Sequence, residues 1–246
     1  MPGRNVLIYP EIFRGGNKKI RAFFTGIIPG VDKDAVCRLM GISGRDLIMP
    51  VQRHTSRVLV YDGEEADKFL PEPADAVITG LSAVAIGVKT ADCVPILLAD
   101  EKKGAIGAVH AGWRGTAAAI LPAAIGKMNE ACCCRPEDIR IAIGPSIRGC
   151  CYEVGRDVLT QVSEATGGFL KILATNENGI LKARLDLAEA NRAQALQAGA
   201  KAENIWVSDV CTCCNTGRFN SYRRETIAGT GHDGGRQGGF IMRVKA

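Results

Sequence analysis

Two apolar runs joined by a short charged link constrain the fold of this chain more than any other feature. Residues 95–100 (PILLAD) and 105–110 (AIGAVH) flank Glu-Lys-Lys-Gly, a link typical of an antiparallel hairpin. A register that pairs the residues next to this link places Pro95 opposite His110 and Cys93 one diagonal step away. Diagonal neighbours lie about 7–8 Å apart at the backbone, so their side chains can converge on one small object. The hairpin therefore predicts a shared site at its open end.

A metal ion is one object that could lie between these side chains. Thiolate and imidazole both suit zinc, and three protein ligands with an open position form a catalytic type of site. The chain has three histidines. His54 precedes a predicted strand at 58–60 and is one of the few candidates for a third ligand; His232 lies in a glycine-rich turn and is expected to be exposed. Spacing alone also fits a buried thiol and a hydrogen-bonded core histidine.

Four longer motifs extend this pattern over about residues 50–243. The chain resembles the YfiH family, also labelled multicopper polyphenol oxidase or laccase-domain proteins, in TADCVPILLAD, VHAGWRGT, AIGPSIRGCCYEVG and CTCCNTGRFNSYRRE. The resemblance implies that His54, Cys93 and His110 hold a zinc ion, with copper as the alternative metal. It does not extend to the N-terminus, where residues 24–30 lack the family's GG-x-S and Asn-Leu-Gly patterns.

The resemblance implies an enzyme acting on purine nucleosides. Its reactions would be phosphorolysis of adenosine or inosine, with methylthioadenosine as a further candidate, to base and ribose 1-phosphate, and deamination of adenosine. A laccase-like oxidation of phenols would be a copper-dependent side activity, because three histidines are too few for a multicopper cluster. Two alternatives stay open: a cysteine hydrolase with Cys93 as nucleophile and His110 as base, and a metal- or nucleoside-binding regulator without turnover.

The candidate catalytic residues are the three metal ligands and Asp92. Asp92 precedes Cys93 and fits two roles equally: orienting a catalytic histidine, a role that another acid could fill, or accepting hydrogen bonds from loop amides. Because Asp92 adjoins the candidate metal ligand Cys93, both roles fit its position.

The candidate residues for substrate and phosphate are Gln52, Gly112, Arg114 and Arg223. Gly112 and Arg114 open a predicted helix, where backbone N–H groups and a guanidinium could receive an anion. They could instead form a plain strand-to-helix turn, with Arg114 paired to an acid. Arg223 lies with Ser221 and Arg224 in the family motif that faces the pocket.

Ten cysteines in 246 residues would suggest disulfides in a small secreted chain, but no export signal is visible. We expect reduced thiols and a cytoplasmic location. Residues 132–134 (CCC) are expected to be structural, and Cys150 and Cys151 to be small packing residues. Residues 211–214 (CTCC) lack a second CxxC pair, which disfavours a structural zinc knuckle.

Charge and hydropathy narrow the classes of partner. The net charge of +5 comes from 31 basic and 26 acidic residues that are scattered along the chain, which disfavours nucleic acid. No apolar stretch reaches the 18 residues of a membrane span. The expected partners are therefore a small nucleoside and phosphate, and the oligomeric state is left open.

The coarse pattern predicts an α+β fold, a single-domain, mixed-sheet α/β sandwich over residues 1–246 with its helices outside. The resemblance implies the same type, shared by cytotoxic necrotising factors and YfiH-like proteins. The segment PEPADAVIT is expected to be a Pro-rich surface connection. The remaining strands are predicted at 6–9, 20–25, 84–88, 139–143, 205–207 and 240–243, and the helices at 32–40, 117–132, 157–165 and 187–198.

Overall fold

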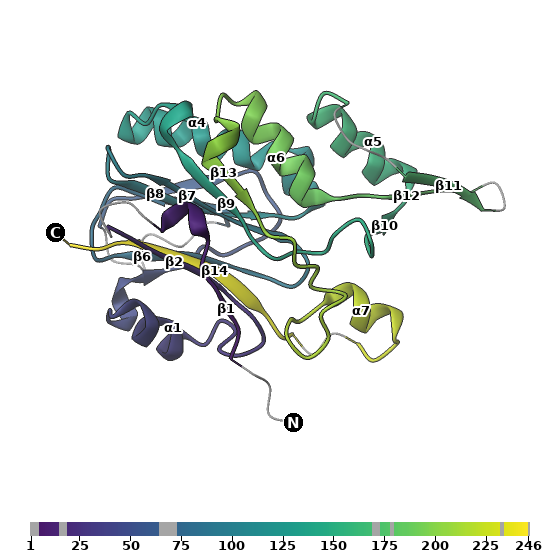
Figure 1. Ribbon diagram of the computed structural model, residues 1–246, viewed down its shortest axis with the longest axis horizontal. Coiled ribbons are helices and arrows are strands. Elements are labelled where there is room, and N and C mark those ends of the chain that lie inside the picture. Colours follow the sequence, from purple (N-terminus) through teal and green to yellow (C-terminus); the bar gives the residue numbers. More distant parts are fainter. Residues whose placement is uncertain are drawn as a thin grey trace.

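Two mixed β-sheets stacked face to face form the centre of the molecule, and helices cover their outer faces (Figure 1). The structure is a computed structural model that describes residues 5–14, 19–63, 73–168, 173–177, 180–231 and 234–245. This arrangement confirms the predicted mixed-sheet α/β sandwich. His232 lies outside the described residues, as does most of the predicted turn at 14–17.

The six-stranded sheet carries the predicted hairpin at its centre. Its strand order is β13-β9-β7-β8-β5-β4. The bounds are β4 Val58–Tyr61, β5 Ala76–Thr79, β7 Val94–Asp100, β8 Ala105–Ala111, β9 Arg140–Ile143 and β13 Ile205–Val207.

The five-stranded sheet lies against one face of the first sheet and has the order β1-β2-β14-β6-β3. Its last strand in the chain, β14, pairs with both β2 and β6, which joins the two ends of the sequence. The bounds are β1 Leu7–Ile8, β2 Ile20–Thr25, β3 Leu47–Ile48, β6 Ala85–Thr90 and β14 Gln237–Arg243.

A small third sheet projects beside the helical layer in Figure 1. It has the order β10-β12-β11, with bounds β10 Glu153–Val154, β11 Leu173–Glu177 and β12 Ile180–Arg184.

The helices lie on the outer faces of the stacked sheets. In Figure 1, α4 and α6 cover the six-stranded sheet and α1 covers the five-stranded one. No helix among the described residues is long and apolar enough to cross a bilayer. The α-helices are α1 Lys33–Met40, α3 Trp113–Ala117, α4 Ile120–Cys132, α5 Arg156–Ala165, α6 Leu187–Gln197 and α7 Tyr222–Ile227, and the 3-10 turns are Glu11–Phe13, Gly44–Asp46, Pro136–Asp138 and Ala202–Asn204.

Strand β7 shows how the layers are built. All seven of its residues are buried because both faces of the sheet are covered. Ile96 and Leu98 pack with the helices, whereas Leu97 and Ala99 pack between the two sheets. The alternation follows from the period of two residues in a strand. The hairpin is thus held rigidly from both sides.

The register of the hairpin is as predicted. Asp100 pairs with Ala105, and Pro95 lies opposite His110. The Asp100 carboxylate accepts hydrogen bonds from the amides of Lys102 and Lys103 and so closes the turn. Cys93 follows β6 and precedes β7, so it lies at the predicted corner beside His110.

The prediction that PEPADAVIT is a surface connection is wrong for its second half. Residues 76–79 form strand β5, whose four residues are all buried. This strand pairs antiparallel with β8 and parallel with β4. A run of four residues beside two prolines carries little periodicity, and burial between two neighbours decides its structure instead.

Candidate metal centre and its pocket

The three predicted metal ligands lie together. One ligand atom from each of His54, Cys93 and His110 falls within 4.8 Å of the others. The Cys93 Sγ lies 3.9 Å from His54 Nε2, and the two imidazole rings meet edge to face with centroids 4.9 Å apart. His110 lies in β8, Cys93 lies in the corner between β6 and β7, and the loop before β4 brings His54. A thiol and two imidazoles thus converge from three separate segments.

Asp75 holds the two histidines in place. Its carboxylate is fully buried and lies 2.7 Å from His110 Nδ1. The same carboxylate accepts hydrogen bonds from the amides of Arg53, His54 and Thr55. Because Nδ1 of His110 is engaged, its Nε2 is the nitrogen left for a metal. The loop that carries His54 is fixed by the same acid.

The charges of these side chains favour a thiolate at Cys93 beside an imidazolium at His110. Burial alone would raise the pKa of Cys93, but the neighbouring His110 and His54 rings lower it to about 6. Burial would lower the pKa of His110, yet the Cys93 thiolate and the Asp75 carboxylate raise it to about 9. Burial would also raise the pKa of Asp75, but hydrogen bonds from His110 and Thr55 hold it below its usual range. The sulfur is thus already in the form that binds metals.

Gly112 leaves the space in which these groups meet. A Cβ atom at this position would lie 2.9 Å from His54 Cδ2 and 3.0 Å from Cys93 Sγ. Its φ of −75° is open to any residue, so the requirement for glycine is steric rather than conformational. The predicted role of Gly112 in phosphate binding remains a prediction.

The three groups open into a cavity of about 580 Å³. This volume lies within the range of small-molecule sites. Aromatic, basic and apolar side chains surround it, and they come from both sheets and from the helices beside them. Its lining includes the aromatic residues Trp113, Tyr152 and Tyr222, the basic residues Lys89, Arg114, Arg223 and Arg236, and the apolar residues Ile147 and Leu187.

The predicted substrate residues Gln52, Arg114 and Arg223 all line this cavity. The Gln52 amide is tied to both backbone groups of Lys89, so it joins the His54 loop to β6. The Arg114 guanidinium lies 4.4 Å from the centroid of Trp113, and no carboxylate among the described residues forms an ion pair with it. Arg114 is therefore available to an anion.

Arg223 is held more firmly than Arg114. Its guanidinium donates to the Glu153 carbonyl and lies 5.0 Å from the centroid of Tyr152. Burial and the Cys93 thiolate raise the pKa of Tyr152 to about 12, so this phenol stays protonated and can donate a hydrogen bond into the cavity.

Asp92 lines the cavity, but both oxygens of its carboxylate accept hydrogen bonds from residues 212–223. One oxygen accepts a 2.6 Å hydrogen bond from the Thr212 hydroxyl. The other accepts from the Ser221 hydroxyl and from the amide of Arg223. The acid that contacts His110 is Asp75. This geometry matches the loop-acceptor role considered for Asp92, and the catalytic role remains a prediction.

Ser221 and Arg224 of the RFNSYRRE motif have structural contacts. Ser221 caps α7 by accepting from the amide of Arg224. The Arg224 guanidinium donates to the carbonyls of Thr212, Cys213 and Phe219. These residues shape the wall behind Asp92 and do not line the cavity.

Asp75 is the functional residue that the sequence analysis missed. It lies directly before the apolar run Ala-Val-Ile-Thr, and an acid next to a buried strand needs a partner. Treating this segment as a surface connection hid that signal. Trp113, Tyr152 and Tyr222 lie within three of the family motifs, but their spacing in the sequence does not show that these distant segments meet at one cavity.

Comparison with known proteins places the chain in a family. The model of the family described as multi-copper polyphenol oxidoreductase laccase matches residues 32–244. Adenosine deaminase RL5, from an unknown prokaryotic organism, is 39% identical over 196 residues, which cover 75% of this chain and 72% of that protein. A purine nucleoside phosphorylase of Bacteroides thetaiotaomicron is 34% identical over 185 residues, covering 73% and 68%.

A solved structure agrees with this placement. The YfiH protein of Bacillus licheniformis superimposes with a TM-score of 0.82 at 26% identity, over 100% of this chain and 97% of that one. The fold and the site thus define a member of the laccase-domain class. The chain belongs to the YfiH family of multi-copper polyphenol oxidoreductase laccase proteins, which confirms the resemblance seen in its motifs.

Proposed function

We propose that this chain is a zinc-dependent enzyme that acts on purine nucleosides, by phosphorolysis to base and ribose 1-phosphate and by deamination of adenosine. The observation that carries the proposal is the convergence of His54, Cys93 and His110 at a cavity lined by aromatic and basic side chains. The names of the relatives supply the substrate class, since they are a purine nucleoside phosphorylase and an adenosine deaminase.

The residues present fit a zinc ion. One thiolate and two imidazoles are zinc ligands, and three protein ligands leave a position for a reactant. The missing Cβ of Gly112 keeps the space between His54 and Cys93 clear. Asp75 completes the carboxylate–histidine arrangement that commonly supports such sites. Copper is a weaker candidate for catalysis, because the chain has three histidines in all.

Bound zinc would supply a Lewis acid and lower the pKa of a water molecule to about 7. Cys93 and His110 would hold it at the open end of the hairpin, and His54 would close the third side. In phosphorolysis, a phosphate oxygen forms a bond to C1′ while the bond from C1′ to N9 breaks and the base leaves. In deamination, water adds at C6 and ammonia leaves. The two reactions need one cavity but different second reactants.

The cavity offers matching groups for nucleoside and phosphate. The rings of Trp113 and Tyr152 line the cavity, and a purine would stack on the ring faces opposite the guanidinium groups of Arg114 and Arg223. Arg114 supplies a guanidinium whose planar donors suit phosphate. Its stacking on Trp113 keeps that charge at the cavity wall. We therefore assign the base to the aromatic side and phosphate to Arg114.

The test is product analysis with metal-quantified protein. Adenosine and inosine are incubated with and without phosphate, and the products are identified by chromatography and mass. Cys93→Ala is run beside wild type, and Cys133→Ala serves as the matched control, because Cys133 is an exposed cysteine outside the metal group. We expect phosphate-dependent release of free base and phosphate-independent inosine from wild type and Cys133→Ala only.

Two outcomes contradict the proposal. One is the absence of product from protein that holds zinc at this site. The other is an unchanged rate in Cys93→Ala, which would assign the activity to a contaminating enzyme.

A second function is favoured by one specific observation. Cys93, His110 and Asp75 form a chain in which a thiolate lies beside an imidazolium that is oriented by a carboxylate. This is the arrangement of a cysteine nucleophile with its base and orienting acid. In that alternative, Asp75 would be the orienting acid, since its carboxylate contacts His110 Nδ1.

Metal content and alkylation separate the two functions. A zinc enzyme holds stoichiometric metal, and its Cys93 resists iodoacetamide until a chelator is added. A cysteine hydrolase is active without metal and loses activity at once on alkylation of Cys93. Peptide mapping by mass spectrometry identifies the modified cysteine in either case.

A further inference from the structure

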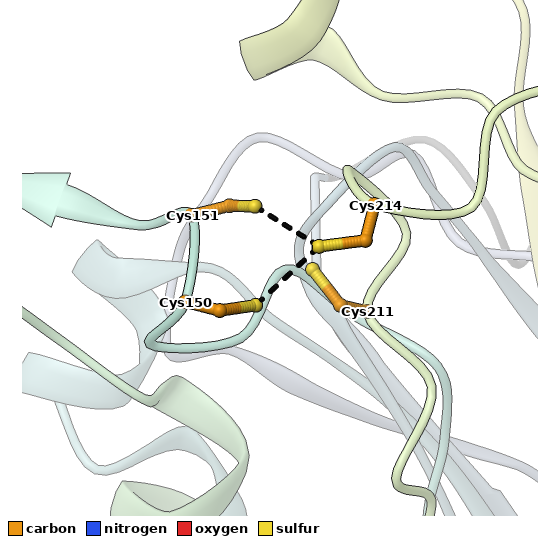
Figure 2. A group of neighbouring side chains, drawn as sticks. All are labelled: Cys150, Cys151, Cys211 and Cys214. Carbon is orange, nitrogen blue, oxygen red and sulfur yellow. Dashed lines mark hydrogen bonds between the residues drawn. The ribbon is translucent and has the colours of Figure 1, made fainter.

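Four cysteines form a second group outside the cavity. Cys150, Cys151, Cys211 and Cys214 each place a sulfur within 4.8 Å of the other three. Figure 2 shows the four side chains pointing toward one another from two chain segments. The Cys214 sulfur lies 3.6 Å from that of Cys150 and 3.3 Å from that of Cys151. Zinc–sulfur bonds of about 2.3 Å in a tetrahedron place sulfurs about 3.8 Å apart, close to both distances.

The local backbone explains how two adjacent cysteines can point to one side. The amides of Cys151 and Tyr152 both donate to the Arg148 carbonyl, so residues 148–152 form a tight turn. In a strand, consecutive side chains would point to opposite faces. The turn removes that restriction, and Cys150 and Cys151 both face Cys214.

The second segment is fixed against the first by backbone contacts. Ser146 and Cys211 form a parallel bridge, and the amide of Thr212 donates to the Ser146 carbonyl. The amide of Arg148 donates to the Cys211 sulfur at 3.5 Å. An N–H···S contact of this kind supports a thiolate in a metal site. These backbone contacts bring the two cysteine-bearing segments together.

Two arginine side chains contact the backbone beside the four sulfurs. The Arg184 guanidinium donates to the Cys150 carbonyl, and that of Arg224 donates to the carbonyls of Thr212 and Cys213. These two cations come from β12 and α7, and they contact the backbone of the two segments that carry the sulfurs. They oppose the net negative charge that four thiolates around one divalent ion carry.

We propose that Cys150, Cys151, Cys211 and Cys214 bind a zinc ion in a closed, four-thiolate structural site. Four protein ligands leave no position for a reactant, so this site is structural rather than catalytic. Cys150 and Cys214 are exposed, so the ion can reach the site from solvent. Cys211 is buried and would cover the ion on the side toward the protein interior. The second pair of cysteines that residues 211–214 lack in sequence is thus supplied by Cys150 and Cys151.

This ion would stabilise the part of the cavity lining that contains Asp92 and Tyr152. Thr212, next to Cys211, donates its hydroxyl to Asp92, and Asp92 precedes the ligand Cys93. Tyr152, next to Cys151, lines the cavity. The four-thiolate site therefore lies one residue from two groups that shape the candidate active site.

The test separates this ion from the one at His54, Cys93 and His110. A Cys93→Ala/His110→Ala double variant is purified anaerobically with reductant, and its zinc is measured by plasma mass spectrometry. We expect about one zinc per chain, with a sulfur-only shell at about 2.3 Å in zinc-edge X-ray absorption. The absorption measurement leaves the four cysteines unchanged, so it does not depend on a cysteine variant that fails to fold.

Two further substitutions in the same background complete the test. Cys214→Ser should lower the zinc content at least tenfold, whereas Cys213→Ser should leave it unchanged, because Cys213 lies in the same loop outside the group. Three results would overturn the proposal: no zinc in the double variant with its thiols reduced, nitrogen or oxygen atoms in the zinc shell, or a disulfide from Cys214 to Cys150 or Cys151. None of these measurements depends on nucleoside turnover.

Discussion

The buried Asp75 carboxylate lies 2.7 Å from Nδ1 of His110, and through it the strand of His110 is connected to the loop of His54. The same carboxylate accepts three amide hydrogen bonds from residues 53–55. Asp75 precedes strand β5, and its carboxylate contacts both the imidazole of His110 and the backbone of the His54 loop. The metal centre depends on a residue that would not itself touch the metal.

Asp75→Asn should weaken metal binding roughly 10- to 100-fold, the usual effect of removing a partner of a ligating histidine. An amide has one acceptor oxygen, and its NH₂ group would face the amide donors of residues 53–55. Competition with a chelator of known affinity measures the loss. Asp138→Asn is the control, because Asp138 forms surface ion pairs with Lys102 and Arg135. Equal affinity in both variants would refute this role of Asp75.

Gly112→Ala should remove metal and activity while the protein stays folded. The added Cβ would lie within 3.0 Å of both His54 and Cys93, so one of these groups must move. Gly126→Ala is the matched control. Gly126 is in α4 with no atom within 4 Å of its Cβ position, and the change should stabilise the helix by about 0.4–1 kcal/mol. Zinc content and thermal unfolding compare the two variants, and full zinc in Gly112→Ala would contradict the steric argument.

How far the sequence predicts this structure depends on how local each feature is. The hairpin register follows from two apolar runs and a four-residue link, all within 16 residues, and it is correct. Strand β5 has four residues, which is too few to show a clear hydrophobic period. The segment between it and its partner β4 has no turn motif that would predict their pairing. Its assignment as a surface connection failed for that reason, and Asp75 was missed with it.

The cysteines show the same limit at longer range. The tight turn at residues 148–152 and the bridge from Ser146 to Cys211 place Cys150 beside Cys214, although 64 positions separate them. Neither the turn nor the bridge produces a hydrophobic period or a motif that can be recognised in a single sequence. Cys93 and His110 were paired correctly because one hairpin carries both, whereas the assignment of His54 as third ligand came from the family resemblance. The extent of a single domain over residues 1–246 remains a prediction.

Cys93 in metal-free protein should react with iodoacetamide as a thiolate down to a pH of about 6. A free thiol has a pKa of about 8.5, and His110 and His54 lower that of Cys93 despite its enclosure. The rate should therefore rise through pH 6 and be level by pH 8. Peptide mapping at each pH isolates Cys93 from the other nine cysteines. His110→Gln removes the larger favourable charge and should move the midpoint upward. A wild-type midpoint near pH 8.5 would rule out the thiolate–imidazolium pair.

Arg114→Ala should raise the KM for phosphate at least tenfold and leave the deamination rate within a factor of two. The guanidinium would contact phosphate, which deamination does not use, and losing a charge-assisted hydrogen bond costs about 1.5–3 kcal/mol. Arg114→Lys should recover part of the loss because a point charge remains. Initial rates at varied phosphate and at varied adenosine measure the two effects. Equal losses in both reactions would show that Arg114 supports the pocket rather than phosphate.

Asp92→Asn and Thr212→Val together decide whether Asp92 is a positioning or a catalytic residue. Asp92 adopts a φ of 83°, which asparagine also tolerates, so the backbone should persist in the variant. Both changes disturb the 2.6 Å hydrogen bond from Thr212 to Asp92. If Asp92 only positions the corner before Cys93, both variants should lose about tenfold in kcat/KM.

The shape of the pH–rate profile is the sharper readout of this pair. A residue that only positions its neighbours leaves the shape unchanged, because no proton passes through it. A catalytic Asp92 would instead make Asp92→Asn far slower than Thr212→Val and remove one limb of its profile. Because Thr212 adjoins Cys211, loss of zinc from the four-cysteine site should mimic Thr212→Val. Equal effects of zinc loss and of Thr212→Val would show that the structural ion stabilises the turn between β6 and β7 that carries Cys93.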